Sequence, residues 1–251
     1  MYDLPAYVWA LVLIAAIGFP VTTSIVLYRG AVQAGISRGT AVAVAVAAAG
    51  VLGGWLVISG MLARAGVYRQ APGDGVPWFP VAFAGVLGAL LLATRIRLVS
   101  RILSAPGAPA RLVLPHTLRV VGVVFLIVMA QGHLPAAFAV PAGVGDIAIG
   151  VAAPFVARQL ARGAGRTEAL RFHVLGLVDL VVALSVGFLL FVLVEVTPST
   201  EPLTLLPLAL IPTVAVPLAF ALHIESLRQL RTAARPQEDQ TGTLMPRPVA
   251  G

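Results

Sequence analysis

Cysteine and lysine are both missing from this chain of 251 residues. Without cysteine, the protein has no disulfide bond, no CxxC redox motif, no thiolate metal ligand and no covalently attached c-type haem. Without lysine, it has no retinal Schiff base, no lysine nucleophile and no P-loop lysine. Charged residues of any kind are scarce, at 11% of the chain.

Apolar residues are correspondingly abundant. They make up 59% of the chain, and the mean hydropathy is +0.97, whereas soluble domains are about 45 to 50% apolar. The composition therefore predicts a polytopic membrane protein, and it favours an all-α helical bundle because an isolated strand cannot satisfy its backbone in lipid. The first apolar run follows Asp3 rather than a basic region and is too long for a signal peptide, so we expect it to remain as a span.

Seven segments are long and apolar enough to cross a bilayer, which takes about 20 residues of helix. They are residues 4–27, 40–62, 76–94, 112–131, 140–156, 172–194 and 203–224. Residues 1–231 are therefore predicted to form one seven-helix transmembrane domain. The polar, proline-containing residues 232–251 are predicted to be a disordered cytoplasmic tail.

Arginine supplies all 17 basic residues, and its distribution predicts the orientation. Fourteen arginines fall on one side of the predicted spans: Arg29, Arg38, Arg95, Arg97, Arg101, Arg111, Arg158, Arg162, Arg166, Arg171, Arg228, Arg231, Arg235 and Arg247. The positive-inside rule then places the C-terminus in the cytoplasm and the N-terminus outside. We expect a multi-pass protein of the inner (plasma) membrane whose basic cytoplasmic face contacts anionic lipid headgroups. Because the arginines serve as topology signals, nucleic acid is not a predicted partner.

Arg119 is the one arginine inside a predicted span. An arginine at the centre of a membrane helix costs roughly 2.5 to 3.5 kcal/mol on insertion scales, so it usually faces a partner or a water-filled cavity. Counted from the cytoplasmic ends of their spans, Arg119 and Asp179 share a depth of about 10 Å. Two interpretations stay open, a buried ion pair between two helices or separate contacts with water and backbone carbonyls.

Three of the four histidines are predicted to lie in one cytoplasmic-side layer: His116, His173 and His223, the last followed by Glu225. Imidazoles at one depth are able to ligate zinc or haem iron, or to relay protons. However, the paired spacings typical of metal sites, HxxxH and HExxH, are absent. Histidines satisfied by lipid phosphate or backbone are commoner, so no cofactor is predicted and a three-histidine metal site is the weaker alternative.

On the outer side, the segment PAGVGD places Gly143 and Gly145 just before Asp146. Glycines permit non-helical backbone, and a helix N-terminus stabilises a carboxylate. Asp146 is therefore either a helix cap or part of a cation or proton site that opens outward near His133.

The last predicted span carries Pro207, Pro212 and Pro217 at a regular spacing of five. Each proline removes a backbone hydrogen bond and tends to kink a helix, which exposes carbonyls that are able to line a cavity. A bent structural helix is the alternative. The three tryptophans are expected only to anchor helices at the membrane interface.

Several motifs recur together in the second half of the chain: Arg119 early in a span, Gly132-x-x-Pro135, Gly-Asp-Ile-x-x-Gly around Asp146, Gly176-Leu177, and the helix IPTVAVPLAFALHIESLRQL. In their order and spacing, residues 114–230 resemble an uncharacterised family of bacterial multi-pass membrane proteins. The resemblance implies no function. In that family a Glu often follows the Arg by one turn and a Trp-Asn pair precedes the Gly-Leu. Here these positions hold Val123 and Phe172-His173, which favours Asp179 as the partner of Arg119 and argues against a family-wide metal role for His173.

These patterns favour a transporter or channel-like protein for a small solute, ion or proton, with Arg119, Asp146 and Asp179 lining the route. An intramembrane metal-dependent enzyme with a His/Asp site near the cytoplasmic face is an alternative of another class, although the sequence leans against an enzyme. A structural or accessory subunit, whose polar residues only specify helix packing, is the third.

Overall fold

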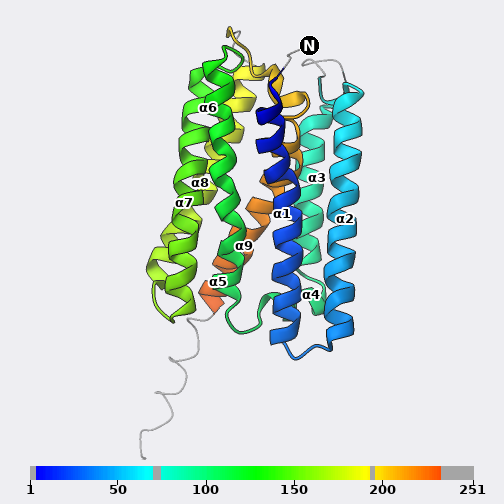
Figure 1. Cartoon of the computed structure of the whole chain (residues 1–251), viewed down its shortest axis with the longest axis vertical. Helices are drawn as coiled ribbons and strands as arrows, with labels where there is room; N and C mark the ends of the chain where they lie inside the picture. The colour runs from blue at the N-terminus through cyan, green and yellow to red at the C-terminus, as the bar shows by residue number, and fades with distance from the viewer. Residues whose placement is uncertain (1–3, 70–74, 193–195, 233–251) are drawn as a thin grey trace, which may run out of the picture.

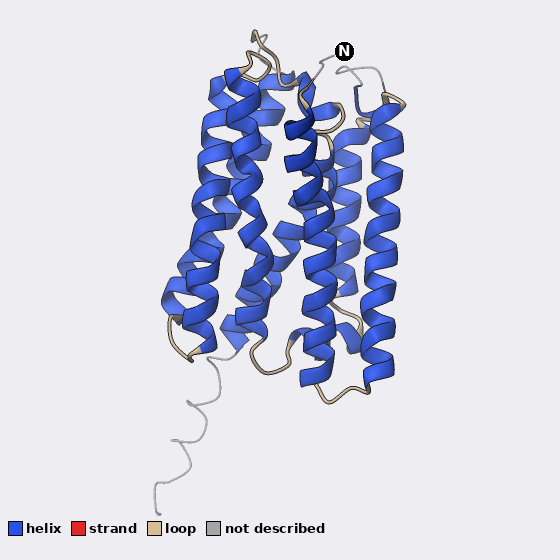
Figure 2. Ribbon diagram, in the orientation of Figure 1, coloured by secondary structure: helices blue, strands red, loops and turns tan. Residues whose placement is uncertain are grey.

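The computed structural model describes residues 4–69, 75–192 and 196–232, and within them the chain forms helices and loops without strands (Figure 2). The elements are α1 (Ala6–Gln33), α2 (Arg38–Arg64), η1 (Val67–Arg69), α3 (Trp78–Ala93), α4 (Arg97–Leu103), α5 (Ala108–Val113), η2 (Leu114–Gly122), α6 (Val123–Ala130), α7 (Ala136–Ala161), α8 (Arg166–Val192), η3 (Glu201–Thr204), η4 (Ile211–Ala215) and α9 (Val216–Thr232). The long helices stand side by side in one bundle (Figure 1). This is the all-α architecture expected from the composition.

Five helices are long and apolar enough to cross a membrane, at residues 6–33, 38–64, 108–130, 136–161 and 166–191. A sixth span is formed only if α3 and α4, which meet at an angle of 84°, are counted together. Each corresponds to a predicted span, and most extend several residues beyond the predicted ends.

The predicted seventh span, residues 203–224, is not a continuous helix. The chain there passes through η3, a turn and the short π-helix η4 before α9 begins at Val216. The prolines explain the break, because Pro212 and Pro217 each lack the N–H that would continue the helical ladder.

This broken segment occupies the interior of the bundle. Between Pro207 and Leu227 every residue is buried except Val216 and Ile224, which are partly buried, and α9 slants across the bundle behind α1 and α5 (Figure 1). Irregular backbone is tolerated at membrane depth only where protein or a cavity surrounds it. Here the surrounding helices enclose the irregular segment.

The outer faces of α2 and α8 show the opposite pattern. Only 11% of the most apolar window of each helix is buried, and large exposed side chains such as Val51, Met61, Leu175 and Leu189 cover these faces. Soluble proteins rarely expose apolar patches of this size. The surface is therefore compatible with a lipid environment.

The arginine-rich loops gather at one end of the bundle. The α1–α2 loop, the α3–α5 connections and the α7–α8 loop all lie at the lower end in Figure 1. Arg235, Arg247 and the predicted tail from residue 233 onward lie outside the described residues. We refer to the lower end as the arginine-rich end, and to the other as the outer end.

Candidate functional site

Arg119 lies at the centre of a cluster that three helical elements build. It is carried by η2, and its side chain is only 2% exposed. Its Nε donates to Oδ1 of Asp146 on α7 at 2.6 Å, and one terminal nitrogen donates to Oδ2 of Asp179 on α8. Of the two interpretations of Arg119 and Asp179, the ion pair is therefore the one present, and Asp146 adds a second carboxylate that the sequence did not assign to Arg119.

The other terminal nitrogen of Arg119 points toward α8 and α9. It lies 3.4 Å from the Gly176 carbonyl oxygen and 3.2 Å from Nε2 of His223. The guanidinium thus joins the two carboxylates to a histidine on the opposite side. With one Arg and two Asp residues, the ionised cluster carries one net negative charge.

The helix-cap interpretation of Asp146 is wrong, because α7 begins at Ala136 and continues through Gly143 and Gly145. The alternative of a cation or proton site that opens outward stays a prediction. Asp146 lies about 15 Å along that helix from its outer end. His133 lies in the turn between α6 and α7.

Asp179 is also deeper than the sequence suggested. Because α8 begins at Arg166 rather than near Phe172, Asp179 lies about 20 Å along the helix from the arginine-rich end. The cluster therefore stands near the middle of the long helices.

Two glycines allow the helices to approach closely enough for these contacts. A Cβ on Gly145 would collide with the carboxylate of Asp179, and a Cβ on Gly176 would collide with the imidazole of His223. Any larger residue at either position would displace the side chain of Asp179 or His223.

A cavity of about 730 Å³ extends from the outer end of the bundle to the two carboxylates. Among the described residues that line it, Asp146 and Asp179 are the only charged ones. Aromatic side chains are concentrated in the wall, which holds six of the ten phenylalanines of the chain together with Tyr68 and Trp78. The lining residues come mainly from α3, α8, η3 and η4.

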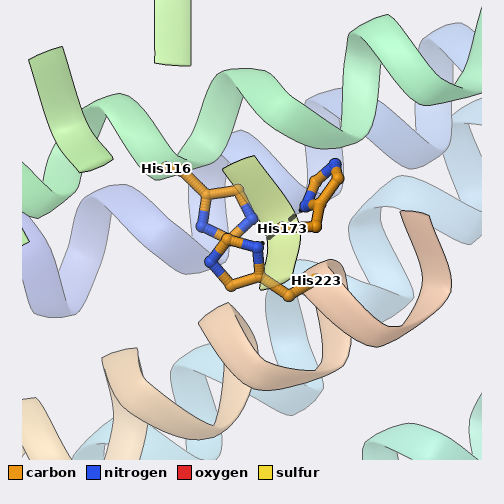
Figure 3. A group of neighbouring side chains, drawn as sticks. All are labelled: His116, His173 and His223. Atoms are coloured by element: carbon orange, nitrogen blue, oxygen red, sulfur yellow. Dashed lines mark hydrogen bonds between the residues drawn. The ribbon is translucent and has the colours of Figure 1, made fainter. Parts of the chain in front are cut away.

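On the other side of Arg119, the three histidines of the predicted layer converge (Figure 3). His116, His173 and His223 have no exposed surface, and their potential ligand atoms all lie within 4.8 Å of one another. The Nδ1 atoms of His173 and His223 are 2.8 Å apart, and the rings of His116 and His223 are stacked with centroids 3.7 Å apart. Among the described residues no carboxylate joins this group, so the His/Asp combination of the enzyme alternative is not assembled.

The hydrogen-bonding roles in this cluster follow from Arg119. Because a guanidinium only donates, Nε2 of His223 accepts, and its Nδ1 carries the proton that is donated to Nδ1 of His173. Within the described part of the chain, Nε2 of His173 and both nitrogens of His116 have no partner. A buried polar group without a partner costs about 1 to 3 kcal/mol.

Glu225 does not join the group of three histidines. Its carboxylate is buried and accepts from Gln229 at 2.5 Å and from Arg228 at 3.3 Å. These contacts lie within α9 itself, so we assign Glu225 a role in that helix.

The polar network that fastens η4 was not anticipated. Pro217 has no N–H to donate to the Thr213 carbonyl, and Nε1 of Trp55 donates to that oxygen at 2.8 Å instead. The Thr213 hydroxyl donates to the Ala209 carbonyl and accepts from Ser59. Trp55 is therefore more than an interface anchor. A proline four residues after a threonine is the only signal in the sequence that points to this contact.

Residues 76–231, more than half of the chain, match the profile of a family described as Domain of unknown function (DUF8737). The chain belongs to this family. The match begins well before Leu114, where the motifs recognised in the sequence start. No curated protein matches the chain, and no solved structure does. Since membership of the DUF8737 family brings no activity with it, the function must be argued from the site.

Proposed function

We propose that the protein is an integral membrane transporter that binds a hydrophobic organic cation in the outer cavity. The observation that carries this proposal is the cavity of about 730 Å³ whose inner end is formed by Asp146 and Asp179. Its size lies within the range of sites for drug-sized ligands, about 300 to 1,000 Å³.

The chemistry of the wall favours a cation with apolar substituents. The Arg119 cluster has one more carboxylate than guanidinium, and a bound monovalent cation would neutralise it. Aromatic rings attract cations through their faces, most strongly where water is excluded. A polar neutral solute would find few hydrogen-bonding partners along this wall.

The arrangement on either side of the cluster favours transport over simple binding. In the described part of the chain, this cavity lies on the outer side of Arg119, whereas the histidines on the other side are fully buried. Charged groups near the bilayer midplane, a broken helix beside them and access from one side are features of alternating-access transporters. The state described here is then the outward-facing one.

Binding of tetraphenylphosphonium to the purified protein tests the cation site. We expect about one probe per chain by equilibrium dialysis, and a loss of affinity of about tenfold in Asp179→Asn, equivalent to about 1.4 kcal/mol. The neutral triphenylphosphine oxide should bind much more weakly. Glu201→Gln is the matched control, because Glu201 is an exposed acid that pairs with Arg69 at the outer end.

Equal affinity for the charged and the neutral probe would contradict the cation site. If binding is confirmed, export of ethidium from proteoliposomes tests transport. Flux should be present in the wild-type protein and in Glu201→Gln, and lost in Asp179→Asn. Binding without flux in the wild-type protein would reduce the proposal to a binding protein.

The orientation is a separate part of the proposal. Because arginine gathers at the end opposite the cavity, we place the arginine-rich end on the cytoplasmic side of the plasma membrane. The cavity then opens to the outside of the cell. A reporter that is active only in the cytoplasm should work when fused after Arg231 and fail when fused between Glu195 and Pro202. Activity at the second position would reverse the direction of the cavity.

A further inference from the structure

We propose that His116, His173 and His223 form a binding site for one transition-metal ion of the Zn²⁺ class. The site is separate from the cation cavity and does not depend on the proposed transport. It would link η2, α8 and α9, the three elements that carry the histidines (Figure 3).

The convergence of the three imidazoles is the first argument. They come from positions 57 and 50 residues apart in sequence, have no exposed surface and bring their potential ligand atoms within 4.8 Å of one another. Nitrogen ligands about 2.0 to 2.1 Å from a zinc ion lie about 3.3 Å apart in a tetrahedral site, so the rings need to approach one another by at most about 1.5 Å. In particular, the separation of 2.8 Å between the Nδ1 atoms of His173 and His223 needs only a small increase to admit a shared ion. The ion takes the place of the proton between these two atoms, and in a neutral His223 that proton then sits on Nε2. The contact between Nε2 and Arg119 is released, while Arg119 keeps its two carboxylates.

The unpaired nitrogens are the second and independent argument. Both nitrogens of His116 and Nε2 of His173 are buried without a partner among the described residues, whereas buried polar groups are normally satisfied. No hydrogen bond from the described residues holds the His116 ring in its stacked position on His223. It is therefore able to turn a nitrogen toward the other two rings, and metal coordination would then satisfy it.

Charge does not oppose a cation here. The Arg119 guanidinium lies 3.2 Å from Nε2 of His223, but Asp146 and Asp179 both pair with it. The group of six side chains carries one net negative charge without a metal and one net positive charge with a divalent ion. The arrangement thus accepts a divalent ion with little change in the magnitude of its charge.

The donor set selects the kind of metal. Three neutral imidazoles suit zinc, cobalt, nickel and copper. Magnesium and calcium require oxygen ligands, and no carboxylate of the described chain belongs to the group. The site should therefore discriminate strongly between zinc and magnesium.

Zinc binding to the untagged, full-length protein in detergent tests this inference. After chelator treatment, the wild-type protein should take up one zinc per chain, and Co²⁺ should give visible absorption bands of a nitrogen-ligated ion. His173→Ala and His116→Ala should each weaken binding by about tenfold or more. His133→Ala should bind as the wild-type protein does, because His133 lies in the α6–α7 turn.

Two outcomes would overturn the site. One is a folded wild-type protein that holds less than about 0.1 zinc per chain at saturation. The other is an equal loss of zinc in His133→Ala and His173→Ala. A monodisperse elution profile of each variant establishes folding, and the tetraphenylphosphonium assay on the same samples separates a failure of this site from a failure of the cation cavity.

Discussion

The two sides of Arg119 differ in open space, in burial and in the kind of polar side chain that each contains. Toward the outer end lies a large cavity with apolar, aromatic walls and two carboxylates at its base. Toward the arginine-rich end, three histidines are packed against one another with no exposed surface. Arg119 contacts both sides at once.

This difference shows how the buried guanidinium of Arg119 organises the interior of the helical bundle. A guanidinium has five N–H donors in a fixed planar fork, so Arg119 is able to hold two carboxylates on one side and an imidazole on the other. The carboxylates then remain available to the cavity, while the histidines are kept away from it. The proposed cation site and the proposed metal site are thus neighbours that share one positioning residue.

Replacement of Arg119 should break both sides and produce the largest effect. In Arg119→Met, two carboxylates remain buried without their partner, and the expected loss of stability is about 3 to 5 kcal/mol. Thermal unfolding in detergent measures it. Binding of tetraphenylphosphonium and of zinc should fall in the same variant.

A triple variant distinguishes function from packing. Arg119→Met combined with Asp146→Asn and Asp179→Asn removes all three charges, so stability should largely return. Binding of the cation should stay lost. Restored stability with unchanged cation binding would show that the three charges serve helix packing and would count against the proposed cation site.

Trp55→Phe should loosen the outer side alone. The substitution leaves the Thr213 carbonyl without its donor, and an unsatisfied buried carbonyl costs about 2 kcal/mol. We expect a fall in melting temperature of several degrees and weaker cation binding, because η4 lines the cavity. Zinc binding should not change. Trp9→Phe, near the outer end of α1, is the matched control and should melt as the wild-type protein does.

Two glycine substitutions should separate the two sides with the smallest effects. In Gly145→Ala the new methyl group displaces the Asp179 carboxylate, and in Gly176→Ala it displaces the His223 ring. Gly145→Ala should lower the affinity for tetraphenylphosphonium by about tenfold, or about 1.4 kcal/mol, and leave zinc binding intact.

Gly176→Ala should have the reverse effect on the two ligands. Gly50→Ala, where a Cβ meets nothing within 4 Å, should change neither. If both site variants lose the same ligand, the two sides are one site, and the comparison drawn above fails.

Hydropathy, periodicity and the placement of arginine were enough to predict the helical bundle and most of its spans. The Arg119–Asp179 ion pair was one of the two interpretations that the sequence left open, and the structure shows it. Apolar runs of sufficient length favour helices in lipid, and an arginine inside a span usually faces a partner or a water-filled cavity. The layer of His116, His173 and His223 was also predicted, because counting residues along a straight helix gives an approximate depth.

The pairing of Asp146 with Arg119 could not be predicted from hydropathy and local sequence patterns. A glycine-rich stretch before a carboxylate is typical of a cap, yet in α7 the glycines serve close packing against neighbouring helices. Local patterns do not distinguish these uses, since the difference depends on which helix lies opposite.

By itself, the sequence determined what each segment is able to do in a membrane. Apolar length, arginine asymmetry and proline positions act locally, through the cost of exposing backbone and charge to lipid. Only the tertiary structure decided that the proline-broken segment lies at the centre, that Asp146 joins Arg119, and that a cavity remains on one side. Those outcomes depend on how side chains from distant helices fill the shared interior, and on which buried polar atoms find partners there.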